Sequence, residues 1–181
     1  PLCRALRSRL TEVLVHTGQH YDPELADLIF DELGVPEPDH ALAVGAGSPV
    51  TQLAVMLERL EPLLLAEDPD MVLVYGDTTT TLAGALAAAK LGIPLAHVEA
   101  GLGSFDRTMP EEQNRVVTDH LSDLLFVPTA TAVDNLAREG ITDAVQLVGD
   151  VMLDAGLMFA PAARTRPGAA AYDLQDGEYL L

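Results

Sequence analysis

Short apolar runs alternate with longer amphipathic segments along the chain. The runs are rich in Val and Leu, and they predict strands at residues 12–15, 71–75, 95–98, 124–127, 145–148 and 178–181. Between them, apolar residues at helical spacing or alanine-rich stretches predict helices at residues 2–10, 23–33, 51–65, 78–91, 110–121, 129–139 and 151–159. This alternation is typical of βαβ units, so we expect an α/β fold with a doubly wound parallel sheet covered by helices.

The domain organisation follows from one change in composition. Residues 161–171 are rich in Ala, Pro, Gly and Arg and predict a linker, with 1–160 as one domain and 172–181 as the start of a second. The helix expected at the start has no strand before it, and the last strand has no element after it. A doubly wound sheet without its first strand would expose an edge and its core, so we expect the 181 residues to be part of a larger protein.

The charge of the chain excludes several classes of partner. Asp and Glu number 28 against 10 Lys and Arg, which gives a formal net charge of −18. Cations this few and scattered form no basic patch, so we expect no binding of nucleic acid or of an anionic membrane surface. The single cysteine, Cys3, excludes an internal disulfide. No apolar run reaches the roughly 18 residues of a transmembrane helix and no signal-peptide pattern is present, so we expect a cytoplasmic protein.

Three acidic residues stand where the strands of a parallel sheet end. Asp77 follows the strand at 71–75, Glu99 follows the strand at 95–98, and Glu111 lies beyond the glycine-containing loop at 101–107. The carboxyl ends of parallel strands meet at one crevice, where neighbouring carboxylates can serve as proton donor and acceptor. Each residue also has a purely structural interpretation. Asp77 suits a helix N-cap, Glu99 a chance polar residue at a strand end, and Glu111 an acid that complements a helix dipole.

Other chemistries find little support in the sequence. The motifs of a Walker A loop, a nucleophile elbow and a zinc-binding H-E-x-x-H helix are all absent. We expect His97 and His120 to be buried or capping histidines rather than metal ligands. The sequence therefore predicts no metal site, and the acidic crevice stays the favoured place for chemistry.

Five motifs, in order along the chain, identify a family. They are Thr17–His20 (TGQH), Val74–Ala83 (VYGDTTTTLA), His97–Leu102 (HVEAGL), Met109–Arg115 (MPEEQNR) and Val148–Ala155 (VGDVMLDA). Together they resemble the non-hydrolysing UDP-N-acetylglucosamine 2-epimerase family, and the resemblance runs from the first residue to the last.

The resemblance implies a GT-B fold of two Rossmann-like domains, of which this chain forms most of the N-terminal one. It implies reversible epimerisation at C2 of UDP-N-acetylglucosamine to UDP-N-acetylmannosamine, by elimination and re-addition of UDP through a 2-acetamidoglucal. No cofactor and no metal is implied. A homodimer and a role in polysaccharide biosynthesis are further expectations from the same resemblance.

The resemblance also assigns roles to residues of this chain. The implied catalytic acids are Asp77, Glu99 and Glu111, without a decision as to which of them takes the proton. The implied substrate-binding residues are Thr78, Gly101, Asn114 and Arg115. A second, regulatory UDP-sugar is implied at Gln19 and His20.

Two positions depart from the family pattern. Gly103 stands where the family usually has an arginine after HVEAGL, and Val55 stands where an arginine often contacts the regulatory sugar. Two alternative functions stay open. One is a 2-epimerase of a UDP-2,3-diacetamido uronic acid, because the motifs at 82–87 and 149–152 suit either sugar, and the other is a catalytically silent UDP-sugar-binding module, which Gly103 favours. A glycosyltransferase of GT-B architecture is less favoured, because no acceptor site is marked in the sequence.

Overall fold

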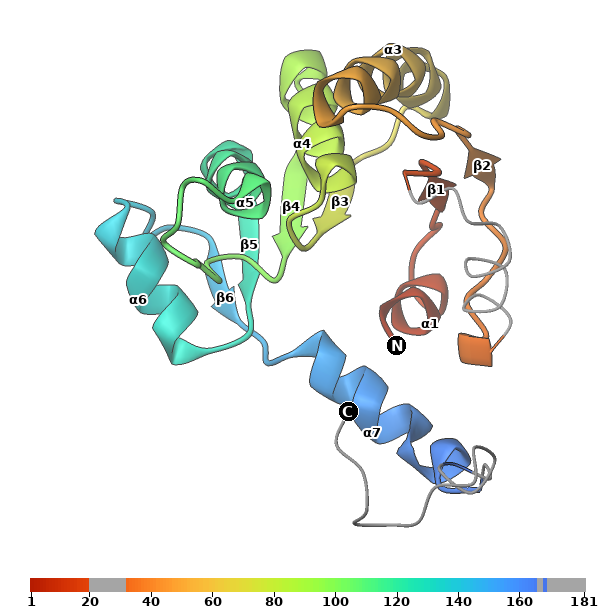
Figure 1. The fold of residues 1–181 in the computed structure, drawn as a ribbon, viewed down its shortest axis with the longest axis vertical. Helices are drawn as coiled ribbons and strands as arrows, with labels where there is room; N and C mark the ends of the chain where they lie inside the picture. Colours follow the sequence, from red (N-terminus) through yellow and green to blue (C-terminus); the bar gives the residue numbers. More distant parts are fainter. Residues whose placement is uncertain (20–31, 166–167, 169–181) are drawn as a thin grey trace.

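The computed structural model describes residues 1–19, 32–165 and 168 (Figure 1). In chain order the elements are α1 (Leu2–Arg7), β1 (Val15–His16), β2 (His40–Ala41), α3 (Pro49–Glu67), β3 (Val72–Tyr75), α4 (Thr79–Leu91), β4 (Leu95–Val98), α5 (Pro110–Leu121), β5 (Leu124–Val127), α6 (Ala130–Arg138), β6 (Val145–Leu147) and α7 (Val151–Ala163). Within these residues no helix is long and apolar enough to cross a membrane.

The main sheet has four parallel strands in the order β3-β4-β5-β6. Strands β1 and β2 form a separate two-stranded parallel sheet. Tyr75 at the end of β3 is in register with Val98 at the end of β4, so the turns that follow these two strands begin side by side. Parallel strands bring their carboxyl ends to one edge, and this edge holds the candidate acids.

Helix α4 shows how the sequence packs helices on this sheet. Thr78 caps its amino end in a reciprocal capping box with Thr81, and Gly92 ends it in a left-handed conformation. A Cβ at Gly84 would lie 2.8 Å from Cγ1 of Val74, so only glycine lets the helix lie this close to β3. The cap and this close packing hold the start of α4 against β3.

Three helices, α3, α4 and α5, lie side by side. Helix α4 packs between α3 and α5, as Figure 1 shows. Buried leucine, methionine and alanine side chains of α3 and α4 form one core cluster, and residues of β5 and α6 form another. Helix α7 leads away from the main sheet and has no buried residue (Figure 1).

Most of the elements expected between residues 71 and 148 are confirmed. The bounds of β4, α5 and β5 are the predicted ones, and β3 and β6 are each shorter by one residue. The α/β class with parallel strands flanked by helices is confirmed as well. Apolar runs that stop at glycine, proline or a polar residue mark these strands without ambiguity.

Other expectations need correction. Thr78 caps α4, so the alternative in which Asp77 is the cap is wrong. Helix α1 ends at Arg7, and Leu10 is largely exposed instead of continuing its apolar face. Helix α3 begins at Pro49 rather than at residue 51, because the hydroxyl of Ser48 accepts a hydrogen bond from the amide of Thr51.

The ends of the chain need separate comment. Of the strand predicted at 12–15 only Val15 is in a strand, because β1 is Val15–His16. Most of the helix predicted at 23–33 and all of residues 172–181 lie outside the described residues. Helix α7 runs through Pro161 to Ala163 and so takes up the first part of the predicted linker at 161–171. A proline inside a helix removes one backbone hydrogen bond, and α7 continues past that loss.

Candidate active site

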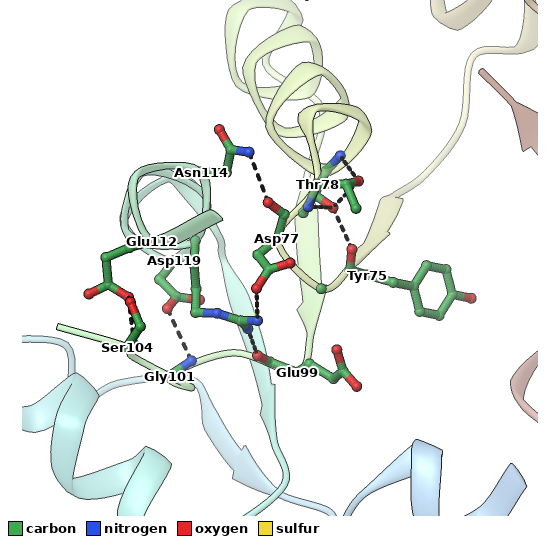
Figure 2. A network of polar contacts seen from close by, with 12 residues as sticks. Tyr75, Asp77, Thr78, Glu99, Gly101, Ser104, Glu112, Asn114 and Asp119 are labelled. Atoms are coloured by element: carbon green, nitrogen blue, oxygen red, sulfur yellow. Dashed lines mark hydrogen bonds and ion pairs between the residues drawn. The ribbon is translucent and has the colours of Figure 1, made fainter. Parts of the chain in front are cut away.

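The turn after β3 carries Asp77 (Figure 2). Gly76 has φ +64°, which lets the chain leave the strand sharply and places Asp77 directly before the helix cap. The side-chain amide of Asn114 donates to the carbonyl oxygen of Asp77 at 2.8 Å. Nη2 of Arg115 donates to Oδ2 of Asp77 at 2.6 Å. Two neighbouring residues of α5 therefore hold both the backbone and the carboxylate of Asp77.

The turn after β4 carries Glu99 in a left-handed backbone conformation, with φ +69°. Such a conformation is unusual for glutamate and persists only where the surroundings enforce it. The surroundings do so here, because Arg115 donates to the carbonyl oxygen of Glu99 and the turn ends in a tightly enclosed glycine. A Cβ at Gly101 would stand 2.6 Å from the carbonyl oxygen of Ala132.

Arg115 thus joins the two turns. One nitrogen of its guanidinium binds the Asp77 carboxylate, and the other binds the Glu99 backbone. Its side chain is 7% exposed and that of Asp77 is 32% exposed, so the cation lies beneath the carboxylate, which itself reaches solvent. Charge-assisted hydrogen bonds of this kind are short and directional, and they fix Asp77 relative to Glu99.

The carboxylates of Glu99 and Glu111 have no hydrogen bond or ion pair to other parts of the described chain. Oε2 of Glu99 lies 3.4 Å from the place where a Cβ of Gly76 would stand, so this carboxylate sits against the turn that bears Asp77. Glu111 is exposed in the first turn of α5, three and four residues before Asn114 and Arg115, and shares their face of the helix. The structure therefore brings Asp77 and Glu99 together and places Glu111 on the helix that holds them.

The neighbouring Glu112 has a structural position instead. It is 6% exposed, and Oε2 accepts hydrogen bonds from the amide of Ser104 at 2.7 Å and from its hydroxyl at 3.1 Å. Figure 2 shows this pair beside the turn after β4. Glu112 therefore anchors the loop that connects β4 with α5, while Glu111 stays free.

The remaining predicted substrate positions are engaged within the protein. Asn114 and Arg115 bind the two turns, and the Gly101 amide and carbonyl groups are hydrogen-bonded to Asp119 and Asn135. Thr78 is exposed, although its hydroxyl takes part in the capping box. Of these residues, Thr78 has the most direct access to solvent.

Gln19 binds the amino end of α4. Its Oε1 accepts from the amide of Thr80 at 3.0 Å and from the Thr80 hydroxyl at 2.9 Å. Gln19, Thr78 and Thr80 also line a hollow of about 210 Å³ beside β1. His20, the other predicted regulatory residue, lies outside the described residues.

Sequence reasoning missed a buried polar pair beneath the turns. His97 is fully buried, as expected, and its two ring nitrogens lie 2.6 Å from Oδ1 of Asp119 and 2.7 Å from the carbonyl oxygen of Gly76. The signal was present in α5, where Glu112, Arg115 and Asp119 recur at intervals of three and four residues. Such a polar stripe on a helix that faces a sheet indicates a buried network.

The pKa of Tyr75, at the end of β3, is shifted. Partial burial raises the pKa of its phenol, and the nearby Cys3 and Glu12 add to the effect. The Tyr75 ring points away from Asp77 (Figure 2). Across the described residues, no three His, Cys, Asp or Glu side chains are placed to hold a metal ion.

Comparison with known proteins assigns the family. The family model described as UDP-N-acetylglucosamine 2-epimerase matches residues 4–181. The chain belongs to the UDP-N-acetylglucosamine 2-epimerase family. Its parallel sheet and helices correspond to about half of the GT-B architecture of these epimerases.

Individual members of the epimerase family give the extent of the likeness. A UDP-N-acetylglucosamine 2-epimerase homolog of Methanococcus maripaludis is 55% identical over 85% of this chain and 43% of its own length. The UDP-2,3-diacetamido-2,3-dideoxy-D-glucuronate 2-epimerase of Pseudomonas aeruginosa is 49% identical over 91% of this chain and 47% of its own. The crystal structure of the Methanocaldococcus jannaschii UDP-GlcNAc 2-epimerase with UDP-GlcNAc and UDP matches with a TM-score of 0.88 and 47% identity, over 93% of this chain and 47% of that one. The chain spans about half the length of the relatives that it matches.

Proposed function

We propose that the protein catalyses the reversible C2 epimerisation of UDP-N-acetylglucosamine to UDP-N-acetylmannosamine. The observation that carries this proposal is the placement of Asp77 and Glu99 on adjacent strand ends, joined by the buried Arg115. A relative with 47% identity was crystallised with UDP-GlcNAc and UDP, which supports a UDP-sugar as the ligand.

The chemistry requires proton transfer on both faces of one carbon. The hydrogen at C2 is not acidic, so simple removal and return of a proton is too costly. In the proposed route a base takes the C2 proton while the C1–O bond breaks and UDP leaves with the bonding electrons. The product is a 2-acetamidoglucal with a C1=C2 double bond. Re-addition of UDP to C1, with delivery of a proton to the opposite face of C2, completes the inversion.

Carboxylates are suited to both proton transfers, and the site offers three of them. We propose that Asp77, Glu99 and Glu111 share these tasks. The ion pair of Asp77 with Arg115 fixes its position, whereas the carboxylates of Glu99 and Glu111 are free to meet a ligand. Thr78, Gly101, Asn114 and Arg115 are the proposed substrate-binding positions, with the last three acting through the shape of the two turns.

A second candidate substrate is a UDP-2,3-diacetamido uronic acid. The Pseudomonas aeruginosa 2-epimerase for this sugar class is 49% identical to the chain, close to the identity of the relatives that act on UDP-N-acetylglucosamine. The reaction at C2 would use the same carboxylates. The two candidates differ at C3 and C6 of the sugar, so a comparison of turnover on both sugars separates them.

The decisive experiment follows the hydrogen at C2. The protein, expressed from its complete gene, is incubated with each UDP-sugar in deuterated water, and NMR spectroscopy follows deuterium at C2 and the appearance of the epimer. We expect both with one of the two sugars, and loss of both in Asp77→Asn and Glu99→Gln variants that remain folded. Binding of a UDP-sugar without C2 exchange would identify a silent binding module, and near-normal rates in both variants would refute the proposed roles.

Four further proposals carry over the remaining expectations from the sequence. A regulatory UDP-sugar would bind at Gln19 and His20, beside the hollow at the amino end of α4. We also propose a homodimer in the cytoplasm that serves polysaccharide biosynthesis. Light scattering of the protein from its complete gene tests the dimer, and the dependence of the initial rate on UDP-sugar concentration tests the regulatory site.

A further inference from the structure

The most completely buried ionisable contact of the site is the one between His97 and Asp119. His97 comes from β4, whose four residues are all buried, and it is 0% exposed. Asp119 comes from α5 and is 4% exposed. Neither side chain reaches the surface where a substrate would bind, so neither is placed to touch the reacting atoms.

The hydrogen bonds of the pair determine where its protons lie. The carbonyl oxygen of Gly76 can only accept, so Nε2 of His97 carries a hydrogen and donates it at 2.7 Å. Oδ2 of Asp119 accepts from the amide of Gly101 at 3.0 Å. The remaining contact, 2.6 Å between Nδ1 and Oδ1, therefore contains one further proton.

These three hydrogen bonds run from one acid-bearing turn to the other. Gly76 directly precedes Asp77, and Gly101 lies two residues after Glu99. The chain of contacts thus passes from Gly76 through His97 and Asp119 to Gly101. Asn135 of α6 extends it by donating to the Gly101 carbonyl oxygen at 2.9 Å.

We propose that His97 and Asp119 are positioning residues that set the distance between the Asp77 and Glu99 carboxylates from beneath the turns. Its kinetic consequence rests on the proposed epimerase function, and its structural consequence rests on the contacts alone. Arg115 connects the same turns from the side of the carboxylates. With both connections in place, the two turns form one rigid unit. Rigid placement matters because an error of about 1 Å in a catalytic group can lower the rate about 100-fold.

The test uses two substitutions of one residue and a control, in the protein expressed from its complete gene. Asp119→Ala removes the connection. Asp119→Asn keeps it, because the amide nitrogen can donate to Nδ1 while the amide oxygen still accepts from Gly101. Asp123→Ala is the control, because Oδ2 of Asp123 accepts from the Leu95 amide at 2.9 Å, at the opposite end of the same strand.

Two readouts are measured for each variant. Backbone hydrogen exchange reports the turns at 76–78 and 99–101, and steady-state kinetics report kcat and KM. For Asp119→Ala we expect exchange in both turns to rise by about tenfold or more, and kcat to fall about 10- to 100-fold with little change in KM. For Asp119→Asn we expect both readouts near those of the unmodified protein. For Asp123→Ala we expect reduced thermal stability with kcat retained.

The outcomes separate this inference from the proposed function. If the unmodified protein turns over neither UDP-sugar, the proposed function fails, while hydrogen exchange still tests the connection between the turns. Unchanged exchange in Asp119→Ala overturns the inference whatever the activity. An equal loss of kcat in Asp123→Ala overturns it too, because the effect would then be general destabilisation. The inference is also overturned if Asp119→Asn changes hydrogen exchange and kcat as much as Asp119→Ala does.

Discussion

Nη2 of Arg115 lies 2.6 Å from Oδ2 of Asp77, while the other guanidinium nitrogen donates to a backbone carbonyl of the next strand end. A planar fork of donors suits this double contact, because it holds two groups at a fixed separation. The residue resembles a substrate-binding cation in the sequence. In the structure its positive charge binds the Asp77 carboxylate and holds that acid in place.

Replacement of Arg115 by lysine tests this position. A single ammonium group cannot hold both partners, so we expect kcat to fall about 10- to 100-fold in Arg115→Lys. We expect the free energy of unfolding to fall by about 1–3 kcal/mol. The loss is no larger because Asp77 is partly exposed, so solvent screens its ion pair. Arg59→Lys is the control, because Arg59 donates to two backbone carbonyl oxygens, those of Leu42 and Ala43, and binds neither acid-bearing turn. A loss of kcat in the control equal to that in Arg115→Lys would contradict the assignment.

Adjacent glutamates in the first turn of α5 are expected to behave differently. Glu111→Gln should abolish C2 hydrogen exchange and leave the thermal midpoint unchanged, because its carboxylate has no partner within the described residues. Glu112→Gln should lower the free energy of unfolding by about 1–2 kcal/mol, because the neutral amide oxygen of glutamine accepts the two hydrogen bonds from Ser104 more weakly than a carboxylate does. The rate of C2 hydrogen exchange and the thermal midpoint are measured for both variants. The same change of rate and of stability in both would refute the different roles of Glu111 and Glu112.

Two glycines with left-handed backbones provide a matched pair for stability. Gly101 has φ +75° and no space for a Cβ, whereas Gly140 has φ +86° and nothing within 4 Å. We expect Gly140→Ala to cost about 1 kcal/mol for the backbone alone. Gly101→Ala should cost about 1–3 kcal/mol more, because the methyl group meets the carbonyl oxygen of Ala132. Urea denaturation measures the difference in the free energy of unfolding. Equal losses in the two variants would show that a Cβ at position 101 fits beside the Ala132 carbonyl oxygen without a free-energy cost.

The single cysteine should be slow to react. Partial burial raises the pKa of the Cys3 thiol, and the hydrogen bond and charge of Glu12 raise it further. A raised pKa leaves less thiolate at a given pH, and the thiolate is the reactive form. We expect Glu12→Gln to speed maleimide labelling at pH 8 by about 2- to 10-fold. Asp39→Asn is the control. Asp39 binds Arg7 as Glu12 does, with Nη2 of Arg7 3.3 Å from Oδ2 of Asp39, but Asp39 does not contribute to the raised pKa of the Cys3 thiol. The labelling rate of Cys3 in this variant should not change.

The strands of the main sheet could be predicted because their apolar runs are short and end abruptly. That Asp77 and Glu99 meet at one edge of the sheet also follows from the sequence, since each residue comes after a predicted strand of a parallel sheet. The choice of helix cap could not be made in this way. Asp77 and Thr78 are both good caps, and the reciprocal contact with Thr81 decides in favour of Thr78 only once the turn is formed.

The buried connections of the site were harder to foresee. His97 lies within an apolar run, and a histidine there has many possible partners until α5 is placed over the strand. Glu111 and Glu112 are alike in the sequence, yet one turns to solvent and the other to Ser104. Which of two neighbouring residues faces the sheet depends on the rotation of the helix about its axis, and packing alone sets that rotation.

The order of the strands has a consequence for synthesis on the ribosome. Each strand from β3 to β6 pairs with the next one along the chain, so the sheet can grow outward as the polypeptide emerges. Both acid-bearing turns leave the exit tunnel before α5 does, and the residues that bind them, Arg115 and Asp119, come later. A nascent chain that stopped before α5 would lack the hydrogen bonds by which Arg115 and Asp119 bind the two turns. The two turns are therefore joined only once α5 has emerged, after both strands that carry them.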